Sequence, residues 1–248
     1  AEKERMTAYG ADMSKYLDSG NEARIKKAYE SRDPRLQMAV ITPYAQYNGA
    51  SSGIAHTYTL RWPYRGSDSA EPFDIRTDTN DKFYYLWRKF VPEGLEQTER
   101  DTYGLDIPLI RYAEVLLLKA EALNEWGSTH ESEAIRCVNE VRRRAGHVEL
   151  NNATYPATKV NGQSDLRERI RNEYYWEIGG EDSMYFHELR WGTWKDKKFD
   201  NNRNGLMQMW GETTYTWYWL GDQCWSWPIP AKELEMNSNL EQNEGWIN

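Results

Sequence analysis

The chain has 248 residues, a formal net charge of −8 and an aromatic content of 14 %, with 12 tryptophans. This length is enough to bury a sizeable core, and the acidic balance argues against nucleic acid as a partner, because phosphates need clustered Lys and Arg side chains. No apolar run approaches the ~20 residues that a membrane-spanning helix needs.

Residues 1–31 are predicted to form one or two helices, with a break at Gly20. Residues 32–104 follow as a long irregular region in which Pro, Gly, Ser and Asn recur. Short strand-like stretches are predicted within it at 36–41, 56–60 and 83–90. A segment this long with little regular structure is uncommon in a compact domain unless it carries function.

The stretch from 107 to 146 predicts two helices joined by a short break. Gly127 ends the first helix, and Ser128 with Glu131 has the spacing of a capping box for the second, which Gly146 ends. The pair forms a helical hairpin of roughly the ~34-residue tetratricopeptide period, and a lone hairpin cannot bury its own apolar face, so at least one further helical unit should flank it. The side chains predicted to share the buried faces are Ile110, Ala113, Leu117, Ala120 and Asn124 in the first helix and Ala134, Val138, Val141 and Ala145 in the second.

A polar linker at 151–164 leads to a helix predicted at 165–178, and a shorter helix is predicted at 184–194. Aromatic residues alternate at 214–219, which predicts a strand. Gly221 and Asp222 would turn this strand back into 224–227 and so form an aromatic hairpin. The remaining residues are expected to close over the helices.

The charged and aromatic residues on the predicted helices are interpreted as parts of the structure and not as parts of a functional site. Glu168, Glu173 and Glu177 share helical spacing with Arg167 and Arg171, so solvated ion pairs explain them before a catalytic carboxylate pair does. The basic run at 142–144 is interpreted as a helix C-terminus that the helix dipole favours. The tryptophans predicted to belong to the core are Trp176, Trp191 and Trp194.

The sequence contains no motif that would carry covalent or metal chemistry. It has no serine nucleophile elbow and no phosphate-binding glycine loop, and its four histidines lack metal-ligand spacing. An acidic stretch at 74–81 lacks the glycine and the terminal glutamate of a calcium hand, and loose Ca²⁺ binding there stays an open alternative. Cys137 and Cys224 are too few for a disulfide framework, and whether they pair stays open. We expect no catalytic residue, no metal site and no cofactor.

An ordered set of short motifs runs through most of the chain, from Arg32 to Trp246. The segments are 32–36 (RDPRL), 110–114 (IRYAE), 120–122 (AEA), Asn139, 141–142 (VR), 144–146 (RAG), 170–173 (IRNE), Glu177, 190–192 (RWG), 228–230 (PIP), Glu233, Asn237, Leu240, 242–243 (QN) and 245–246 (GW). With these motifs the chain resembles the C-terminal half of the SusD/RagB family of surface nutrient-binding lipoproteins from Bacteroidetes. It departs from the family pattern at Met184 and His187, where many members carry an arginine and an aspartate, which removes the basis for an ion pair there.

The resemblance implies a mostly α fold, a tetratricopeptide-like helical scaffold (an α/α superhelix) with a long irregular, partly β ligand face. Residues 1–248 would be the C-terminal part of a single SusD-like domain. Within it, the helical start, the ligand face, the helical repeat with its following helices, and the aromatic hairpin with the closing tail would occupy 1–31, 32–104, 105–195 and 196–248.

The function implied by the resemblance is capture without catalysis. Such a protein binds a glycan at the cell surface and delivers it to a SusC-like, TonB-dependent transporter of the outer membrane. Its membrane association would rest on a lipid anchor that is absent from this chain. The same fold in RagB-like members handles peptides, and a glycoside hydrolase is a further alternative that a carboxylate pair in an aromatic cleft would support.

Candidate ligand residues lie in the irregular region, where flat rings can pack on sugar C–H faces and polar side chains can bind the hydroxyls. The rings are Tyr44, Tyr47, Trp62 and Tyr64, and Arg65 and Asp68 beside them are hydrogen-bonding candidates. The competing interpretation is that these rings only pin the long segment to the helices beneath it.

Overall fold

A computed structural model describes residues 21–30, 32–51, 54–64, 74–78, 86–94, 106–181, 183–199 and 219–246. The chain divides into two compact units, Ala1–Met184 and Tyr185–Asn248, each of which is described by itself. The interpretation of the chain as part of one domain stays a prediction. Within the described residues, no helix combines the length and the apolar character that crossing a bilayer requires.

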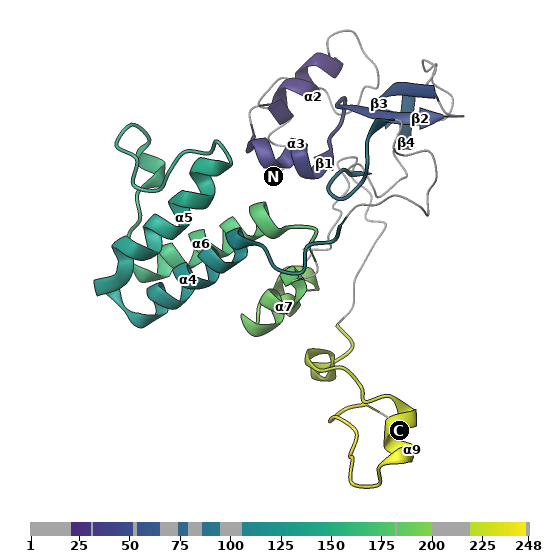
Figure 1. Cartoon of the computed structure of the whole chain (residues 1–248), viewed down its shortest axis with the longest axis vertical. Coiled ribbons are helices and arrows are strands. Elements are labelled where there is room, and N and C mark those ends of the chain that lie inside the picture. The colour runs from purple at the N-terminus through teal and green to yellow at the C-terminus, as the bar shows by residue number, and fades with distance from the viewer. Residues whose placement is uncertain are drawn as a thin grey trace. The chain divides into compact units, whose positions relative to one another are not determined.

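Three helices form the scaffold of the first unit: α4 (Tyr112–Trp126), α5 (Glu131–Arg144) and α6 (Gln163–Ile178). They pack against one another, and Figure 1 shows α4 and α6 lying side by side. The predicted hairpin and its flanking helical unit are therefore confirmed. Its interior consists of fully buried side chains from all three helices, namely Leu117, Ala120, Ala134, Val138, Leu166, Ile170, Tyr174 and Ile178.

One predicted core residue lies outside this interior. Ile110 is 74 % exposed because the helix begins only at Tyr112, with Arg111 in an extended conformation before it. Asn124, by contrast, is buried as predicted. Its amide nitrogen donates to the Gln163 carbonyl at 3.1 Å, and the Gln163 side chain donates back to the Asn124 carbonyl at 2.7 Å, so the end of α4 is joined to the start of α6.

The two ends of α5 differ in how well they match expectation. At its C-terminus Gly146 has a φ of 71°, and the amides of Gly146 and His147 donate to the carbonyls of Arg143 and Arg142. This is the Schellman pattern that the glycine predicted. At its N-terminus the predicted capping box is wrong, because Ser128 lies inside a 3₁₀ turn, η2 (Ser128–His130), and makes no side-chain cap.

Two short helices precede the strands: α2 (Asn21–Glu30) and α3 (Pro34–Ala39). The helix after Gly20 is thus confirmed, whereas the remainder of 1–31 lies outside the described residues. The strand predicted at 36–41 is wrong except for its last two residues. The Asp33 side chain accepts a hydrogen bond from the Arg35 amide, and Pro34 occupies the first helical turn, so a capped start overrides the apolar pattern.

The strands form two small sheets. β1 (Val40–Ile41) pairs antiparallel with β5 (Leu86–Trp87), which retains only part of the stretch predicted at 83–90. β2 (Gln46–Ser51) pairs antiparallel with β3 (Ile54–Tyr64), which contains the predicted strand at 56–60 and extends it. β4 (Asp74–Asp78) runs parallel to β3, so part of the acidic stretch is a strand. Neither β2 nor β4 is predicted from the sequence.

In the second unit, the structure describes short helices and aromatic contacts. Helix α7 (Ser183–Arg190) crosses the boundary between the units, and α8 (Trp194–Lys198), η4 (Asp222–Trp225) and α9 (Ala231–Met236) follow. The predicted hairpin is wrong at its second strand, because 222–225 forms a 3₁₀ turn. Its first strand lies largely outside the described residues. Both cysteines are free, and Cys137 is buried.

Candidate ligand-binding site

Helix α6 presents buried carboxylates to arginines from other helices. Glu173 is fully buried, and its two oxygens accept hydrogen bonds from Arg35 Nη1 of α3 at 2.7 Å and from Arg142 Nη1 of α5 at 2.8 Å. Glu177, one turn later, accepts from the same Arg35 nitrogen at 3.1 Å. A buried carboxylate is tolerated only when it is paired, so these ion pairs fix α3 against the scaffold.

The network continues past the end of α6. Glu177 also accepts from Arg111 Nη1 at 2.9 Å and from Arg144. Glu181 accepts from Arg111 Nη2 at 2.6 Å and from Lys89 Nζ at 2.5 Å. The ion pairs therefore bring residues from positions 89, 111 and 144 together at the C-terminal end of α6.

The interpretation of the α6 acids as solvated pairs is wrong for two of the three. Glu173 and Glu177 are buried and bind arginines outside their own helix. Only the exposed Glu168 pairs within the helix, with Arg171 at 3.5 Å.

Burial and arginine contacts compete for the charge state of two carboxylates in this network. Burial alone would raise the pKa of Asp33, but hydrogen bonds from the Arg35 side chain and amide, with the charge of Arg35, outweigh it and leave the pKa below its ordinary value. Burial likewise opposes ionisation of Glu177, while hydrogen bonds from Arg111 and Arg35 and the charge of Arg144 lower its pKa. Both groups are therefore held as carboxylates.

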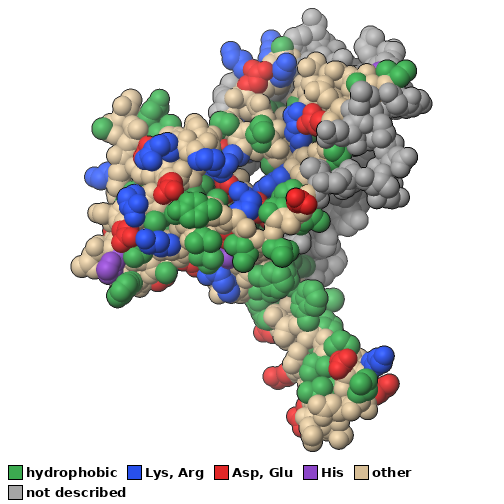
Figure 2. Space-filling view, viewed as in Figure 1, with side chains coloured by type: hydrophobic (Ala, Val, Ile, Leu, Met, Phe, Trp, Pro, Cys, Tyr) green, Lys and Arg blue, Asp and Glu red, His purple; other side chains and the backbone are tan. Residues whose placement is uncertain are grey.

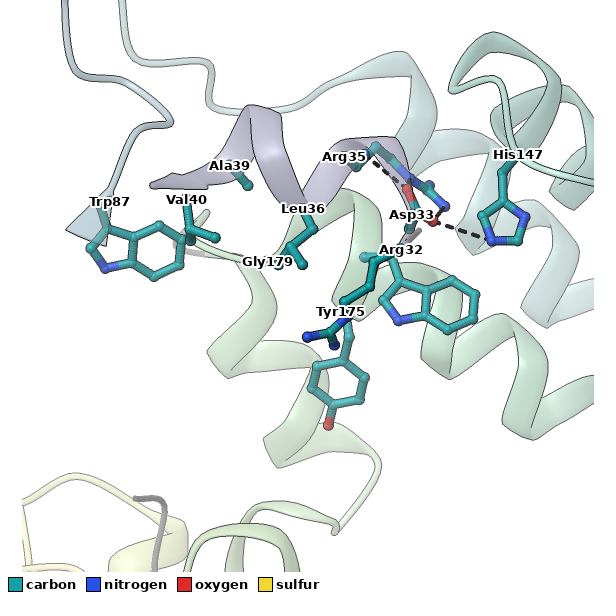
Figure 3. A pocket seen from close by; sticks show the side chains of 11 residues that line it. Arg32, Asp33, Arg35, Leu36, Ala39, Val40, Trp87, His147, Tyr175 and Gly179 are labelled. Atoms are coloured by element: carbon teal, nitrogen blue, oxygen red, sulfur yellow. Dashed lines mark hydrogen bonds and ion pairs between the residues drawn. The ribbon is translucent and has the colours of Figure 1, made fainter. Parts of the chain in front are cut away.

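A cavity of about 350 Å³ opens beside this network. Its volume falls in the range of roughly 300–1,000 Å³ that small-molecule sites occupy. Figure 3 shows a ring at one end, Trp87, with charged Asp33 and polar His147 at the other and Leu36 between them. The full lining comprises Arg32, Asp33, Arg35, Leu36, Ala39, Val40, Trp87, His147, Tyr175, Trp176 and Gly179.

The aromatic walls of the cavity remain accessible. Trp176 is 45 % exposed and Trp87 is 58 % exposed, so the prediction that Trp176 belongs to the core is wrong. Trp176 stacks on His147, with ring centroids 5.7 Å apart and planes inclined by 14°, and Arg142 lies 5.9 Å from the Trp176 ring centre. Its ring is therefore held in place.

The tautomer of His147 is assigned from the shorter of its two Nδ1 contacts. Its Nδ1 lies 2.9 Å from Arg142 Nη2, which can only donate, and this contact is shorter than the 3.2 Å to the Val148 carbonyl. Nδ1 is therefore the acceptor and Nε2 carries the hydrogen. Nε2 lies 3.4 Å from Asp33 Oδ2, so the polar end of the cavity presents an ordered imidazole and carboxylate.

Glycine at position 180 makes room for the Trp87 ring. Gly180 has a φ of +83°, and a Cβ atom there would lie 2.7 Å from the Trp87 ring. The turn after α6 thus allows the indole to approach the backbone closely, which positions one wall of the cavity.

The structure separates the six ligand residues predicted from the sequence. Tyr44 and Tyr47 are buried, and the Tyr47 hydroxyl donates to the Pro92 carbonyl at 2.9 Å. Tyr47 packs with Ile41 and Leu60 in a small core, in line with the alternative that such rings pin the segment. The backbone of β3 includes Trp62 and Tyr64, whereas Arg65 and Asp68 lie outside the described residues. Their role as ligand contacts stays a prediction.

Three aromatic residues of the cavity, Trp87, Tyr175 and Trp176, were not predicted as ligand residues from the sequence. Trp176 follows the fully buried Tyr174 by two positions, which on a helix is a rotation of about 200°. That spacing puts the two rings on opposite faces and was a usable signal. Trp87 offered no comparable local signal, because it reaches the cavity through pairing of β5 with β1.

A family model described as the SusD family matches residues 7–246. The chain belongs to the SusD family. The resemblance drawn from its motifs is thereby confirmed.

Among curated proteins, the chain is 33 % identical over 139 residues to SusD-like protein P38 of Formosa agariphila, covering 56 % of this chain and 24 % of that protein. It is 28 % identical over 161 residues to the starch-binding protein SusD of Bacteroides thetaiotaomicron, covering 64 % and 25 %. The alignments therefore span well under two thirds of these SusD-family relatives.

Solved structures show the same fold. A SusD-like protein from Bacteroides fragilis superimposes with a TM-score of 0.62 at 20 % identity, covering 98 % of this chain and 46 % of that one. A SusD-like carbohydrate-binding protein from the same species gives a TM-score of 0.54 at 24 % identity, covering 86 % and 42 %. The predicted mostly helical, SusD-like fold is confirmed.

Proposed function

We propose that this SusD-family chain contributes to a non-catalytic glycan-binding site. The observation that carries the proposal is the cavity walled by Trp87, Tyr175 and Trp176, with Asp33 and His147 at its polar end. Flat rings pack on the C–H faces of a sugar, while a carboxylate and an imidazole bind its hydroxyl groups. Carbohydrate binding is also the property for which one of the solved relatives is described.

The family adds the setting in which such a site would work. We infer a protein held at the cell surface by a lipid anchor, which passes its glycan to a SusC-like, TonB-dependent transporter in the outer membrane. Trp62, Tyr64, Arg65 and Asp68 are kept as candidates for further ligand contacts. Tyr44 and Tyr47 would support that face from the core and would not stack on sugar.

Binding without turnover is expected because the acids of the candidate site are occupied. Asp33 and Glu177 are held ionised by arginines, so neither is available as the protonated general acid that a glycosidase needs. These two carboxylates therefore fit recognition of a glycan and not general-acid catalysis of its hydrolysis.

The test is calorimetry of the chain against a panel of plant, host and microbial polysaccharides, with assay of reducing ends. Trp176→Ala is the main variant and Trp62→Ala tests the predicted upstream face. The matched control is Trp126→Ala, since Trp126 is 76 % exposed, stacks on His130 and does not line the cavity. Loss of one stacking ring should weaken binding about tenfold, on the order of 1.4 kcal/mol.

The result that supports the proposal is binding of one glycan, weakened by Trp176→Ala, unchanged in Trp126→Ala and without new reducing ends. Binding that only Trp62→Ala weakens would move the site to the upstream face. Release of reducing ends would contradict the non-catalytic role. Absence of binding to every polysaccharide of the panel, with circular dichroism showing a folded chain, would contradict glycan binding and favour peptide ligands.

A further inference from the structure

A second cavity, of about 290 Å³, adjoins the first and differs from it in charge. The two share Arg35, Ala39 and Trp176 in their linings, so Trp176 borders both. The second is lined by four cationic side chains and a single acid, Glu177. Its remaining lining is apolar or aromatic. The four cations are Arg35, Lys89, Arg111 and Arg144.

The charges of the surrounding network do not balance. Its carboxylates are those of Asp33, Glu173, Glu177 and Glu181, and its cations are Arg35, Lys89, Arg111, Arg142 and Arg144. Four carboxylates thus face five Lys and Arg side chains, so the network has one positive charge in excess before His147 is counted. Figure 2 shows Lys and Arg side chains gathered around a hollow in this part of the first unit, although the chain as a whole is acidic.

The accessible N–H groups that have no acceptor among the described residues belong to two arginines. Arg144 is 58 % exposed at its side chain, and among the described residues it donates one of its five N–H groups, to Glu177. Among the described residues, Arg111 keeps one N–H of Nη1 beyond the bond to Glu177. Arg35 likewise keeps one N–H of Nη2 beyond the bond to Asp33, but its side chain is only 10 % exposed. Lys89, by contrast, has three acceptors for its three N–H groups, at Glu181 and at the carbonyls of Glu177 and Gly179. Arg144 and Arg111, whose side chains are 58 % and 27 % exposed, are thus the accessible groups able to bind a further acceptor.

We propose that the second cavity binds an anionic substituent of a glycan, a carboxylate or a sulfate ester, while the neighbouring sugar ring packs on Trp176 in the first cavity. The planar fork of an arginine matches both anions, and charge-assisted hydrogen bonds are the stronger kind. The inference rests on the proposed glycan-binding function and narrows it to acidic glycans. Glu177 stays bound to Arg35 and Arg111 when Arg144 turns to the ligand.

The experiment compares ligands that differ only in charge. The chain is titrated with oligogalacturonate and with its neutral methyl ester, and separately with a sulfated galactan oligosaccharide and its desulfated form. Preference for the charged member of the first pair identifies a carboxylate site, and preference in the second pair a sulfate site. Either preference should fall as ionic strength rises, because salt screens charge.

The main variant is Arg144→Gln, and the chain supplies a matched control in the adjacent Arg143. That arginine is 65 % exposed and is bridged to Glu149 at 2.8 Å, and it lines neither cavity. Arg144→Gln should weaken binding of the charged ligand about tenfold and leave the neutral ligand unchanged, whereas Arg143→Gln should change neither. Arg144→Lys keeps the charge without the fork, so we expect it to recover part of the loss.

Three outcomes overturn the inference. Equal binding of the charged and the neutral ligands overturns the inference but leaves the proposed glycan binding intact. If Arg143→Gln and Arg144→Gln weaken binding of the charged ligand equally, the effect is one of overall charge and not of a local site, and the inference is overturned. Absence of binding to every charged and neutral ligand, in a folded chain, overturns the inference together with the proposed function.

Discussion

Asp33 and Glu177 are carboxylates that arginines keep ionised against the effect of burial. Their folded-state pKa values lie below the ordinary values of 3.8 and 4.5 that they regain on unfolding. A carboxylate with a lowered folded pKa stabilises the fold fully above its unfolded pKa. That stabilisation is lost as the pH falls through the folded pKa, since the unfolded chain then binds more protons.

The free energy of unfolding should therefore decrease as the pH is lowered from about 6 to about 3. Urea unfolding followed by circular dichroism at several pH values measures it, and the midpoint concentration should fall over that range. In Glu177→Gln, one of the two groups no longer titrates, so its midpoint should depend less steeply on pH. A midpoint that stays constant down to pH ~3 in the unsubstituted chain would contradict the argument.

Glu173 shows why the spacing of residues along one helix did not predict the ion pairs of the site. The sequence interpretation paired Glu173 with arginines of its own helix, but its actual partners, Arg35 and Arg142, lie 138 and 31 residues away in the sequence. Nothing in the spacing along α6 carries that information. Only the burial of the whole helix face makes a distant arginine necessary.

At the scale of elements, side-chain amides join the helices to the segments between them. The Asn139 amide nitrogen on α5 donates to the Leu150 carbonyl at 3.2 Å, and the Leu150 amide donates to Asn139 Oδ1 at 2.7 Å. Leu150 is itself buried, so both of its backbone groups depend on this one side chain. The Asn139 side chain thereby anchors the segment that connects α5 to α6.

Asn139→Ala should therefore destabilise the chain by about 1–3 kcal/mol, less the few tenths that the better helix propensity of alanine returns. Urea unfolding measures the change, and hydrogen exchange at the Leu150 amide should quicken. The control is Asn161→Ala, because Asn161 is exposed and its side-chain amide makes only a long 3.4 Å bond to the Lys159 carbonyl among the described residues. Equal costs for the two substitutions would contradict this role of Asn139.

Elements with strong local signals were predicted well, and those that depend on distant pairing were not. The glycine after α5 and the apolar periodicity of α4 to α6 are local, and the structure has these helices close to where they were expected. β5 needs β1, which is more than forty residues earlier, as its pairing partner. The start of α3 had a local signal in Asp33 and Pro34, but the apolar run that follows was given more weight.

At the scale of the whole first unit, Glu173 is the point where three helices meet. Arg35 of α3 holds one oxygen of its carboxylate and Arg142 of α5 holds the other. Figure 1 shows α3, α5 and α6 as separate elements of this unit. The helical scaffold was predictable from periodicity, whereas the candidate cavities were not, because they form only where these elements are held together.

This arrangement predicts strong coupling between Arg35 and Arg142 in a double-mutant cycle. Replacing either one by methionine leaves Glu173 with one partner, whereas replacing both leaves a fully buried carboxylate with no cation among the described residues. The double variant should therefore be less stable than the two single losses predict, by about 0.5–3 kcal/mol. A cycle of Arg35 with Arg143, which shares no partner with it, should be additive within about 0.5 kcal/mol. Urea unfolding of all the variants measures both cycles. Additivity in the Arg35–Arg142 cycle would mean that Glu173 does not couple α3 to α5, and that the cavities beside it are held open by apolar packing alone.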